Sequence, residues 1–161
     1  MTRKASFEPV VDAATRILVL GSLPGEESLA RGQYYANPRN AFWRLAGDVV
    51  GVDLVGLAYP DRLAALAAGG IGLWDVVATA RRDGSLDTAI RDVRANDLAR
   101  LVAALPELRL VAFNGGKAAV IGERQLASDP VPRLVLPSSS PAHTLSYAAK
   151  SLAWQNLCSY L

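Results

Sequence analysis

The sequence contains little of what disulfide frameworks and membrane anchors are made from. Its 161 residues include one cysteine, Cys158, so no internal disulfide can form. The opening stretch Met1–Leu20 has no apolar block of the length that a signal peptide or a membrane span needs. These absences favour a reducing, cytoplasmic location and argue against a membrane partner.

Strong charge of either sign is also missing. The formal net charge is +2 and the sequence pI is about 8.9, a surplus that permits a nucleic-acid partner without identifying one. There is no internal repeat, low-complexity tract or charge block, while hydrophobic residues make up 51% of the chain. This composition excludes a disordered chain and predicts a single compact domain over residues 1–161.

Four short apolar runs are typical of strands in a covered parallel sheet. Three of them begin with arginine and end in small or polar residues: Arg16–Ser22, Arg109–Gly115 and Arg133–Ser139. The fourth run is Ile71–Val77. Their hydrophobic residues are continuous rather than alternating, which indicates strands that are buried on both faces.

Helical patterns occupy the segments between these runs. Apolar residues recur at helical spacing in four segments, namely Phe42–Val50, Pro60–Ala68, Asn96–Leu105 and Tyr147–Leu161. Strands that alternate with helices predict an α/β three-layer sandwich, with a central, mostly parallel four-stranded sheet between helices. Ligands of such sheets bind beyond the carboxyl ends of the strands, which here carry the loops GSLPG, NGG and PSSSPAH.

The stretch YYANPRNAFWRL, Tyr34–Leu45, concentrates aromatic rings and carboxamides around Pro38. Aromatic faces stack on a flat heterocycle and amides read its polar edge, so the stretch suits a base-binding site. A local explanation fits the same residues, because Pro38 sets a turn and Asn40 is placed to cap a helix that follows. The residues alone leave both interpretations open.

The loops after the strands contain no nucleotide-binding motif. GSLPGEESL lacks the GxGxxG pattern, and FNGGKAAV lacks the P-loop pattern. Their small residues would still let a phosphate approach backbone N–H groups, with Lys117 just inside the following helix, although for either loop alone an ordinary tight strand-to-helix turn is the favoured interpretation. In LPSSSPAHT, the hydroxyls of Ser138, Ser139 and Ser140, followed by His143, suit a loop that grips phosphate.

Six segments, taken in order, resemble one family. GSLPG, YYANPRNAFW, LWD, GSLD, FNGGKA and LPSSSPAH, spread between Ile17 and Trp154, are similar to segments of the uracil-DNA glycosylase superfamily, and most of all to its hypoxanthine-DNA (deoxyinosine) glycosylase branch. The resemblance implies a parallel four-stranded sheet between helices. It also implies a monomeric, monofunctional enzyme without metal or cofactor, which hydrolyses the N-glycosidic bond of a deaminated base flipped out of DNA and leaves an abasic site.

The resemblance also implies roles for individual residues. Leu23 stands where related mismatch-specific glycosylases carry a catalytic Asn or Asp, so the catalytic role passes to Asn40 of the PRN segment, with Asn114 as a second donor toward the leaving base. Tyr35 matches the aromatic residue on which the flipped base stacks, and Phe42 and Trp43 would hold the helix start in the core. The remaining expected contacts are Ser22 and Leu23 to the base, and Gly21, Pro24, Ser138, Ser139, Ser140, His143 and Lys117 to DNA.

Other functions remain open at this stage. The same superfamily includes enzymes directed at uracil, and a xanthine-directed glycosylase is also possible. Ser22, Asp75 and His143 occur in the chain order of an α/β-hydrolase triad, but GSLPG is not the GxSxG of a nucleophile elbow. A DNA-binding module without catalysis is a third possibility. Asp75 itself lies on a hydrophobic strand and is interpreted as a structural hydrogen-bonding group rather than a base.

Overall fold

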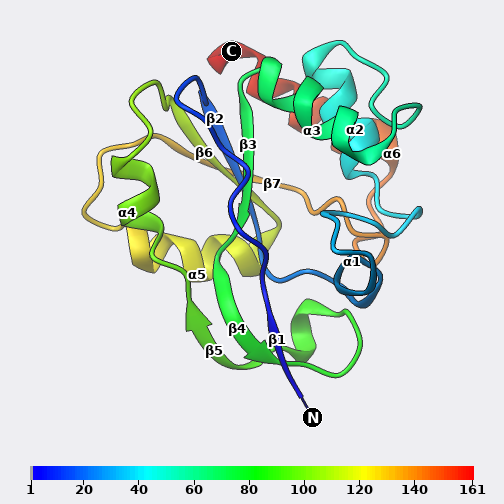
Figure 1. The fold of residues 1–161 in the computed structure, drawn as a ribbon, viewed down its shortest axis with the longest axis vertical. Coiled ribbons are helices and arrows are strands. Elements are labelled where there is room, and N and C mark those ends of the chain that lie inside the picture. Colours follow the sequence, from blue (N-terminus) through cyan, green and yellow to red (C-terminus); the bar gives the residue numbers. More distant parts are fainter. Residues whose placement is uncertain (1) are drawn as a thin grey trace.

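A four-stranded parallel sheet lies at the centre of the protein. The structure is a computed structural model that describes residues 2–161 (Figure 1). The strand order in the sheet is β3-β2-β6-β7, with β2 at Ile17–Gly21, β3 at Ile71–Asp75, β6 at Leu110–Asn114 and β7 at Arg133–Leu136. Each strand falls inside one of the four apolar runs, so the predicted parallel sheet is confirmed.

Helices cover both faces of this sheet, as the α/β prediction requires (Figure 1). On one face lie α2 (Phe42–Val50), α3 (Tyr59–Ala68) and α6 (Tyr147–Trp154), and on the other lie α4 (Leu98–Ala103) and α5 (Gly116–Leu126). The α6 segment continues only as the 3-10 helix η2 (Gln155–Tyr160), so the helix predicted to reach Leu161 is shorter. A short helix that the pattern did not predict, α1 (Glu26–Arg31), follows the GSLPG loop. No helix within residues 2–161 has the length and apolar character needed to cross a membrane.

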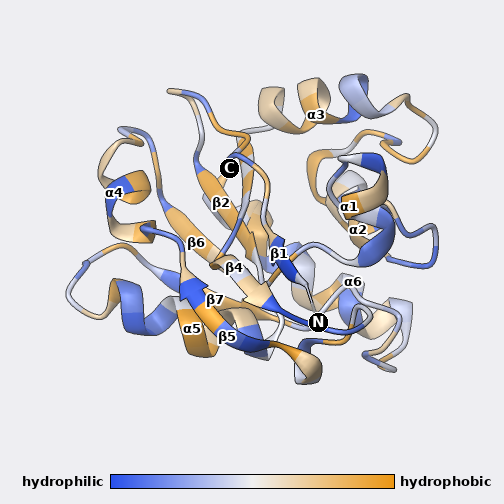
Figure 2. Ribbon diagram, turned by 60° about the horizontal axis from the view of Figure 1, so that its bottom comes forward, coloured by the Kyte–Doolittle hydropathy of each residue, from blue (hydrophilic) through white to orange (hydrophobic). Residues whose placement is uncertain are grey.

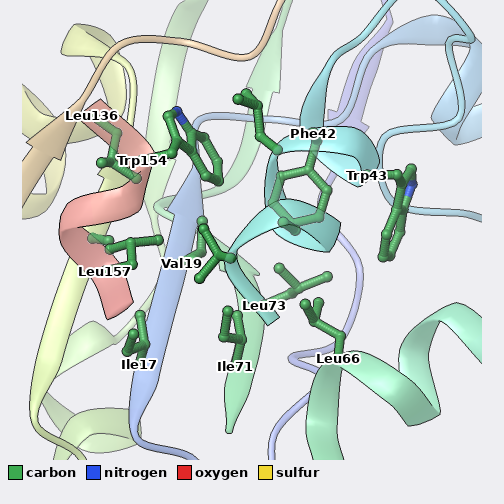
Figure 3. Packing of buried hydrophobic residues seen from close by; sticks show 14 of the residues in the cluster. Ile17, Val19, Phe42, Trp43, Leu66, Ile71, Leu73, Leu136, Trp154 and Leu157 are labelled. Atoms are coloured by element: carbon green, nitrogen blue, oxygen red, sulfur yellow. The ribbon is translucent and has the colours of Figure 1, made fainter. Parts of the chain in front are cut away.

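The continuous apolar runs are explained by two cores. Along β2, Ile17 and Val19 belong to the cluster under α2, α3 and α6, while Leu18 and Leu20 belong to the cluster under α4 and α5. Figure 3 shows the first cluster, in which Phe42 packs among the strand residues. The strands are accordingly coloured as hydrophobic between more polar helices in Figure 2. Each fully buried aliphatic side chain of this kind contributes about 1.5–3 kcal/mol of transfer free energy.

A second, antiparallel sheet was not predicted. It has the order β1-β4-β5, with β1 at Arg3–Ala5, β4 at Val77–Arg81 and β5 at Arg91–Ala95. Only Val76 separates β3 from β4, so the chain passes directly from the central sheet into this smaller one (Figure 1). The connection between β4 and β5, residues 82–90, contains the 3-10 helix η1 (Asp87–Ala89) and lies against the GSLPG loop.

The strand order places a topological switch point at the carboxyl ends of β2 and β6. From β2 the chain leaves toward α1, α2 and α3 before forming β3, whereas β6 is followed by α5 on the opposite face. Neighbouring strands whose connections leave to opposite faces define a switch point, where open α/β sheets bind ligands. Gly21 ends β2 and Asn114 ends β6, so both lie at this point.

Candidate active site

Three segments meet at Gly21, the last residue of β2. In the sheet register Gly21 lies opposite Asp75, the last residue of β3. A Cβ atom placed on Gly21 would lie 2.6 Å from Asp75 Oδ1 and 2.9 Å from Tyr35 Oη. Distances below about 3.0 Å are not tolerated by a carbon atom, so glycine is required for these two polar groups to converge over the strand end.

Tyr35 is held in an unusual backbone conformation. Its φ of 53° lies in the left-handed region, which bulky residues seldom occupy. The neighbouring peptide is fixed because Ala36 N donates to Ser28 Oγ at 3.0 Å. The Tyr35 ring stacks on Phe42, with centroids 4.0 Å apart and planes inclined by 16°. Phe42 therefore covers one face of a partly exposed ring, and a flat ligand would stack on the other face.

Asn40 organises the start of α2, and its side chain keeps one free donor. The N-cap of α2 is Ala41, which has no side-chain cap bond, so the prediction that Asn40 occupies the cap position was wrong by one residue. Asn40 Oδ1 nevertheless accepts from Phe42 N, the first residue of the helix, at 2.9 Å. Since a backbone N–H requires an oxygen as its partner, this bond fixes which way the carboxamide points. Asn40 Nδ2 donates to no protein group within residues 2–161. The adjacent Ala41 N donates to Ser139 O at 3.0 Å and ties this turn to the serine loop.

Asn114 connects Tyr35 to the serine loop. Its Nδ2 donates to Ser139 Oγ at 2.8 Å and to Tyr35 Oη at 3.3 Å, while its Oδ1 accepts from Ser139 N at 2.9 Å. The turn that follows needs Gly115, whose φ is 101°. Both amide hydrogens of Asn114 are thus engaged within the protein. Its expected role as a donor to the base stays a prediction, whereas its role in positioning Tyr35 is directly visible.

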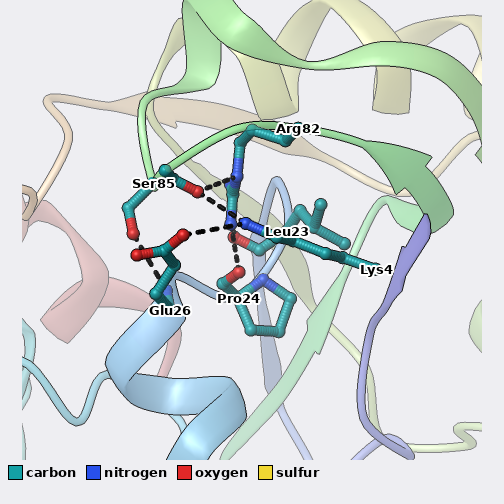
Figure 4. A network of polar contacts seen from close by, with 7 residues as sticks. Lys4, Leu23, Pro24, Glu26, Arg82 and Ser85 are labelled. Atoms are coloured by element: carbon teal, nitrogen blue, oxygen red, sulfur yellow. Dashed lines mark hydrogen bonds and ion pairs between the residues drawn. The ribbon is translucent and has the colours of Figure 1, made fainter. Parts of the chain in front are cut away.

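The first loop is held by residues that the sequence patterns did not single out. Ser22 Oγ donates to Asp87 Oδ1 at 2.6 Å, and the side chain of Leu23 is buried in the α4–α5 cluster. The buried guanidinium of Arg82 donates to the backbone carbonyls of Leu23 and Pro24 (Figure 4). A base contact from Leu23 would therefore come from its backbone. Arg82 directly precedes the segment that holds the GSLD motif, and that motif was the available signal for this clamp.

The serine loop is built around a buried lysine. Ser139 is buried against Asn114, and Ser140 N donates to Ser138 Oγ at 3.1 Å. Lys150, on α6, donates through its Nζ to Ser140 O at 3.1 Å, and burial lowers the pKa of this ammonium. The loop is consequently preformed, with Ser138 and Ser140 partly exposed along it.

The residues proposed above for a hydrolase triad are not joined. Ser22 is bonded to Asp87, while His143 is exposed and its side chain makes no hydrogen bond to any described residue. Lys117, expected to contact DNA, is half-buried and lines a groove between α5 and β5. The locations of His143 and Lys117 do not test whether these residues contact DNA, so both expected contacts stay predictions.

Asp75 differs from its interpretation as a structural hydrogen-bonding group. Its side chain is 4% exposed, forms no hydrogen bond to a described residue, and leaves Oδ2 without a partner among residues 2–161. Burial, helped by the negative charge of Asp87, raises the pKa of this carboxyl to about 7, and Arg82 lowers it only in part. That interpretation was wrong, because only the backbone carbonyl of Asp75 is bonded, by Asn96 Nδ2 at 2.7 Å.

An aromatic face, a free carboxamide donor and a hydroxyl-rich loop at the switch point form a site suited to a flat heterocycle attached to a phosphate chain. Residues 8–158 match the family model of the uracil DNA glycosylase superfamily. The chain therefore belongs to this superfamily.

Relatives and a solved structure agree with this assignment. Two proteins named hypoxanthine DNA glycosylase, from Methanosarcina barkeri and Methanosarcina acetivorans, are 42% identical over 154 residues and 43% identical over 152 residues. Each alignment covers 94% of this chain and 96% of the relative. A solution NMR structure from Methanosarcina acetivorans, provisionally described as a uracil DNA glycosylase, has a TM-score of 0.88 at 41% identity and covers 98% of this chain and 97% of that one.

Proposed function

We propose that this protein is a hypoxanthine-DNA glycosylase of base-excision repair. The observation that carries the proposal is the pairing of Tyr35, a partly exposed residue whose ring is backed by Phe42, with Asn40, whose amide group is oriented by its bond to Phe42 N but donates to no described residue. The names and the identities of the two Methanosarcina relatives support hypoxanthine as the base. The product would be free hypoxanthine and an abasic site, with the DNA strand intact.

Base engagement is the first step of the proposed reaction. A base inside a duplex is unreachable, and rotating its nucleotide outward costs a few kcal/mol, less at a mispair. Stacking on the open face of Tyr35 offsets about 1–3 kcal/mol of this cost. Because Phe42 supports the other face of Tyr35, the ring needs little reorganisation when the base arrives.

Bond cleavage is the second step. As the glycosidic bond breaks, positive charge develops on the sugar and negative charge on the base, so a preorganised donor aimed at the base accelerates the reaction. Asn40 Nδ2 is proposed as this donor, since its partner atom Oδ1 is already committed to Phe42 N. Asn114 acts first by fixing Tyr35 and Ser139, through its hydrogen bonds to both.

The DNA backbone is proposed to lie along the two loops at the strand ends. Within the described residues, the peptide N–H groups of Ser22 and Leu23 donate to no other backbone group. In the serine loop after β7, the partly exposed Ser138 and Ser140 carry hydroxyls. Such groups bind phosphates without reading sequence. His143 is the proposed wedge into the vacated base stack, since it is the bulky exposed residue beside Ala142.

The experiment is a panel of duplex oligonucleotides that contain one inosine, uracil, xanthine or unmodified adenine. The purified protein is incubated with each duplex in the presence of a chelator, and abasic sites are revealed by alkali. The proposal expects cleavage after alkali with inosine as the preferred substrate, and free hypoxanthine by chromatography. Faster excision of uracil than of hypoxanthine would show that the protein is a uracil-directed glycosylase instead. Cleavage of the DNA strand without alkali would reject a monofunctional enzyme.

A further inference from the structure

Asp75 occupies the part of the site where the edge of a stacked base would lie. Its Oδ1 and the hydroxyl of Tyr35 converge at the carboxyl end of β2, 2.6 Å and 2.9 Å from the place where a Cβ of residue 21 would stand, so both groups use the room that glycine leaves. Tyr35 carries the ring on which the base is proposed to stack. Asp75 Oδ2 is buried and has no hydrogen-bond partner within residues 2–161, so this carboxyl, which the mechanism proposed above does not use, is available to the polar edge of a base held beside the Tyr35 hydroxyl.

No neighbouring group neutralises the Asp75 carboxyl by direct contact. Arg82 directs its guanidinium to the backbone carbonyls of the first loop and of Gly84 (Figure 4). Asp87, from the same β4–β5 connection, is bonded to Ser22 and adds a like charge. From the α1–α2 connection, Tyr34 and Tyr35 face Asp75 as neutral phenols, because burial raises the pKa of both.

A buried carboxyl without a partner is more stable neutral than ionised. In the free protein burial raises the pKa of Asp75 to about 7, so both forms are populated near neutrality. A bound base removes the remaining water from the carboxyl, which favours the neutral form further.

The two forms have opposite consequences for a base with a lactam edge. A neutral carboxyl has one O–H donor and one acceptor oxygen, which match the O6 acceptor and the N1–H donor of hypoxanthine. An ionised carboxylate only accepts, so it would repel O6 and the negative charge that develops on the leaving base.

We propose that Asp75 is a base-contacting residue that works in its neutral form, donating its proton in a hydrogen bond to the carbonyl oxygen of a lactam base and accepting from the adjacent ring N–H. The proposal rests on the proposed function, since it assigns a further contact in that same site. No proton is transferred, and the carboxyl is neutral before and after the base leaves. Ionisation of Asp75 consequently switches the site off.

The first test is the pH dependence of single-turnover excision from an inosine duplex, for wild type and for Asp75→Asn. With enzyme in excess over DNA but below saturation, the wild-type single-turnover rate constant is expected to fall about tenfold per pH unit above pH 7, because under these conditions it reports ionisation of the free enzyme. Asp75→Asn keeps a donor and an acceptor but cannot ionise, so its rate should vary less than about threefold from pH 6 to pH 9 on the same reasoning. Asp83→Asn removes an exposed carboxylate from the β4–β5 connection and should keep the wild-type profile. An alkaline limb that persists in Asp75→Asn would overturn the proposal.

The second test does not depend on catalysis. Binding of a duplex with a non-cleavable 2′-fluoro-arabino inosine is measured by calorimetry at pH 8 in buffers of different ionisation enthalpy. Wild type should take up about one proton on binding and Asp75→Asn about none, because the bound base holds the carboxyl neutral. Binding with equal proton uptake in both proteins would reject the role of Asp75 alone. Absence of both excision and inosine-specific binding would reject the proposed function together with this contact.

Discussion

The buried carboxyl of Asp75 makes a quantitative prediction about stability. Its pKa is raised from the ordinary 3.8 to about 7, chiefly by burial. The folded protein therefore holds a proton that the unfolded chain releases between these two pH values. Since the folded state binds more protons over that range, the free energy of unfolding must fall as pH rises from about 4 to about 7, and then level off.

The magnitude follows from the size of the shift. One pKa unit corresponds to about 1.4 kcal/mol, and Asp75 is half ionised at pH 7, so its titration lowers the free energy of unfolding by about 2 kcal/mol between pH 5 and pH 7. Asp75→Asn removes this contribution, and its stability relative to wild type should rise by that amount over the interval. In a chain of this length, the corresponding change in the Tm difference is about 4–8 °C.

Urea unfolding of both proteins at pH 5, 6, 7 and 8 measures this effect. The difference between variant and wild type cancels the other titrating groups, and Asp83→Asn controls for the loss of one negative charge near Arg82. A difference between Asp75→Asn and wild type that stays constant from pH 5 to pH 8 would show that Asp75 is not held in a raised-pKa environment. The result does not depend on activity.

Three further predictions concern the base site. Asn40→Asp keeps an oxygen that can accept from Phe42 N but replaces the amide donor with a negative charge. Single-turnover excision should therefore fall at least about a hundredfold while the fold stays intact. Asn37→Asp, in the same turn, is the control and should stay near the wild-type rate. Tyr35→Phe retains the stacking ring and should keep most activity, while Tyr35→Ala should lose about 1–3 kcal/mol of base engagement; equal losses would favour the hydroxyl as the contact. Gly21→Ala places a Cβ 2.6 Å from Asp75 Oδ1 and should impair excision, whereas Gly116→Ala, with no atom within 4 Å of its Cβ, should not; circular dichroism checks that both remain folded.

The sequence alone determined the central sheet, most of the helices that cover it and the loops that form the site. The strand that begins at Ile17 could be recognised because a strand buried on both faces has apolar residues at nearly every position. This pattern lies within a few consecutive residues, so it is visible in the sequence. Asn40 as the organiser of a helix start was predictable for the same reason, since a cap bond joins residues close together in the chain.

Only the tertiary structure decided which polar groups face one another. The exposed strand Arg91–Ala95 has no buried face and hence no hydrophobic pattern, so the second sheet could not be predicted. Asp75 and Asn114 illustrate the same limit. What distant segments place beside these side chains decides that the Asp75 carboxyl is unpartnered among residues 2–161 with a raised pKa and that the Asn114 carboxamide is fully hydrogen-bonded. Those contacts, from Tyr35, Asp87 and Ser139, depend on how the chain folds, because desolvation and hydrogen bonding act through space.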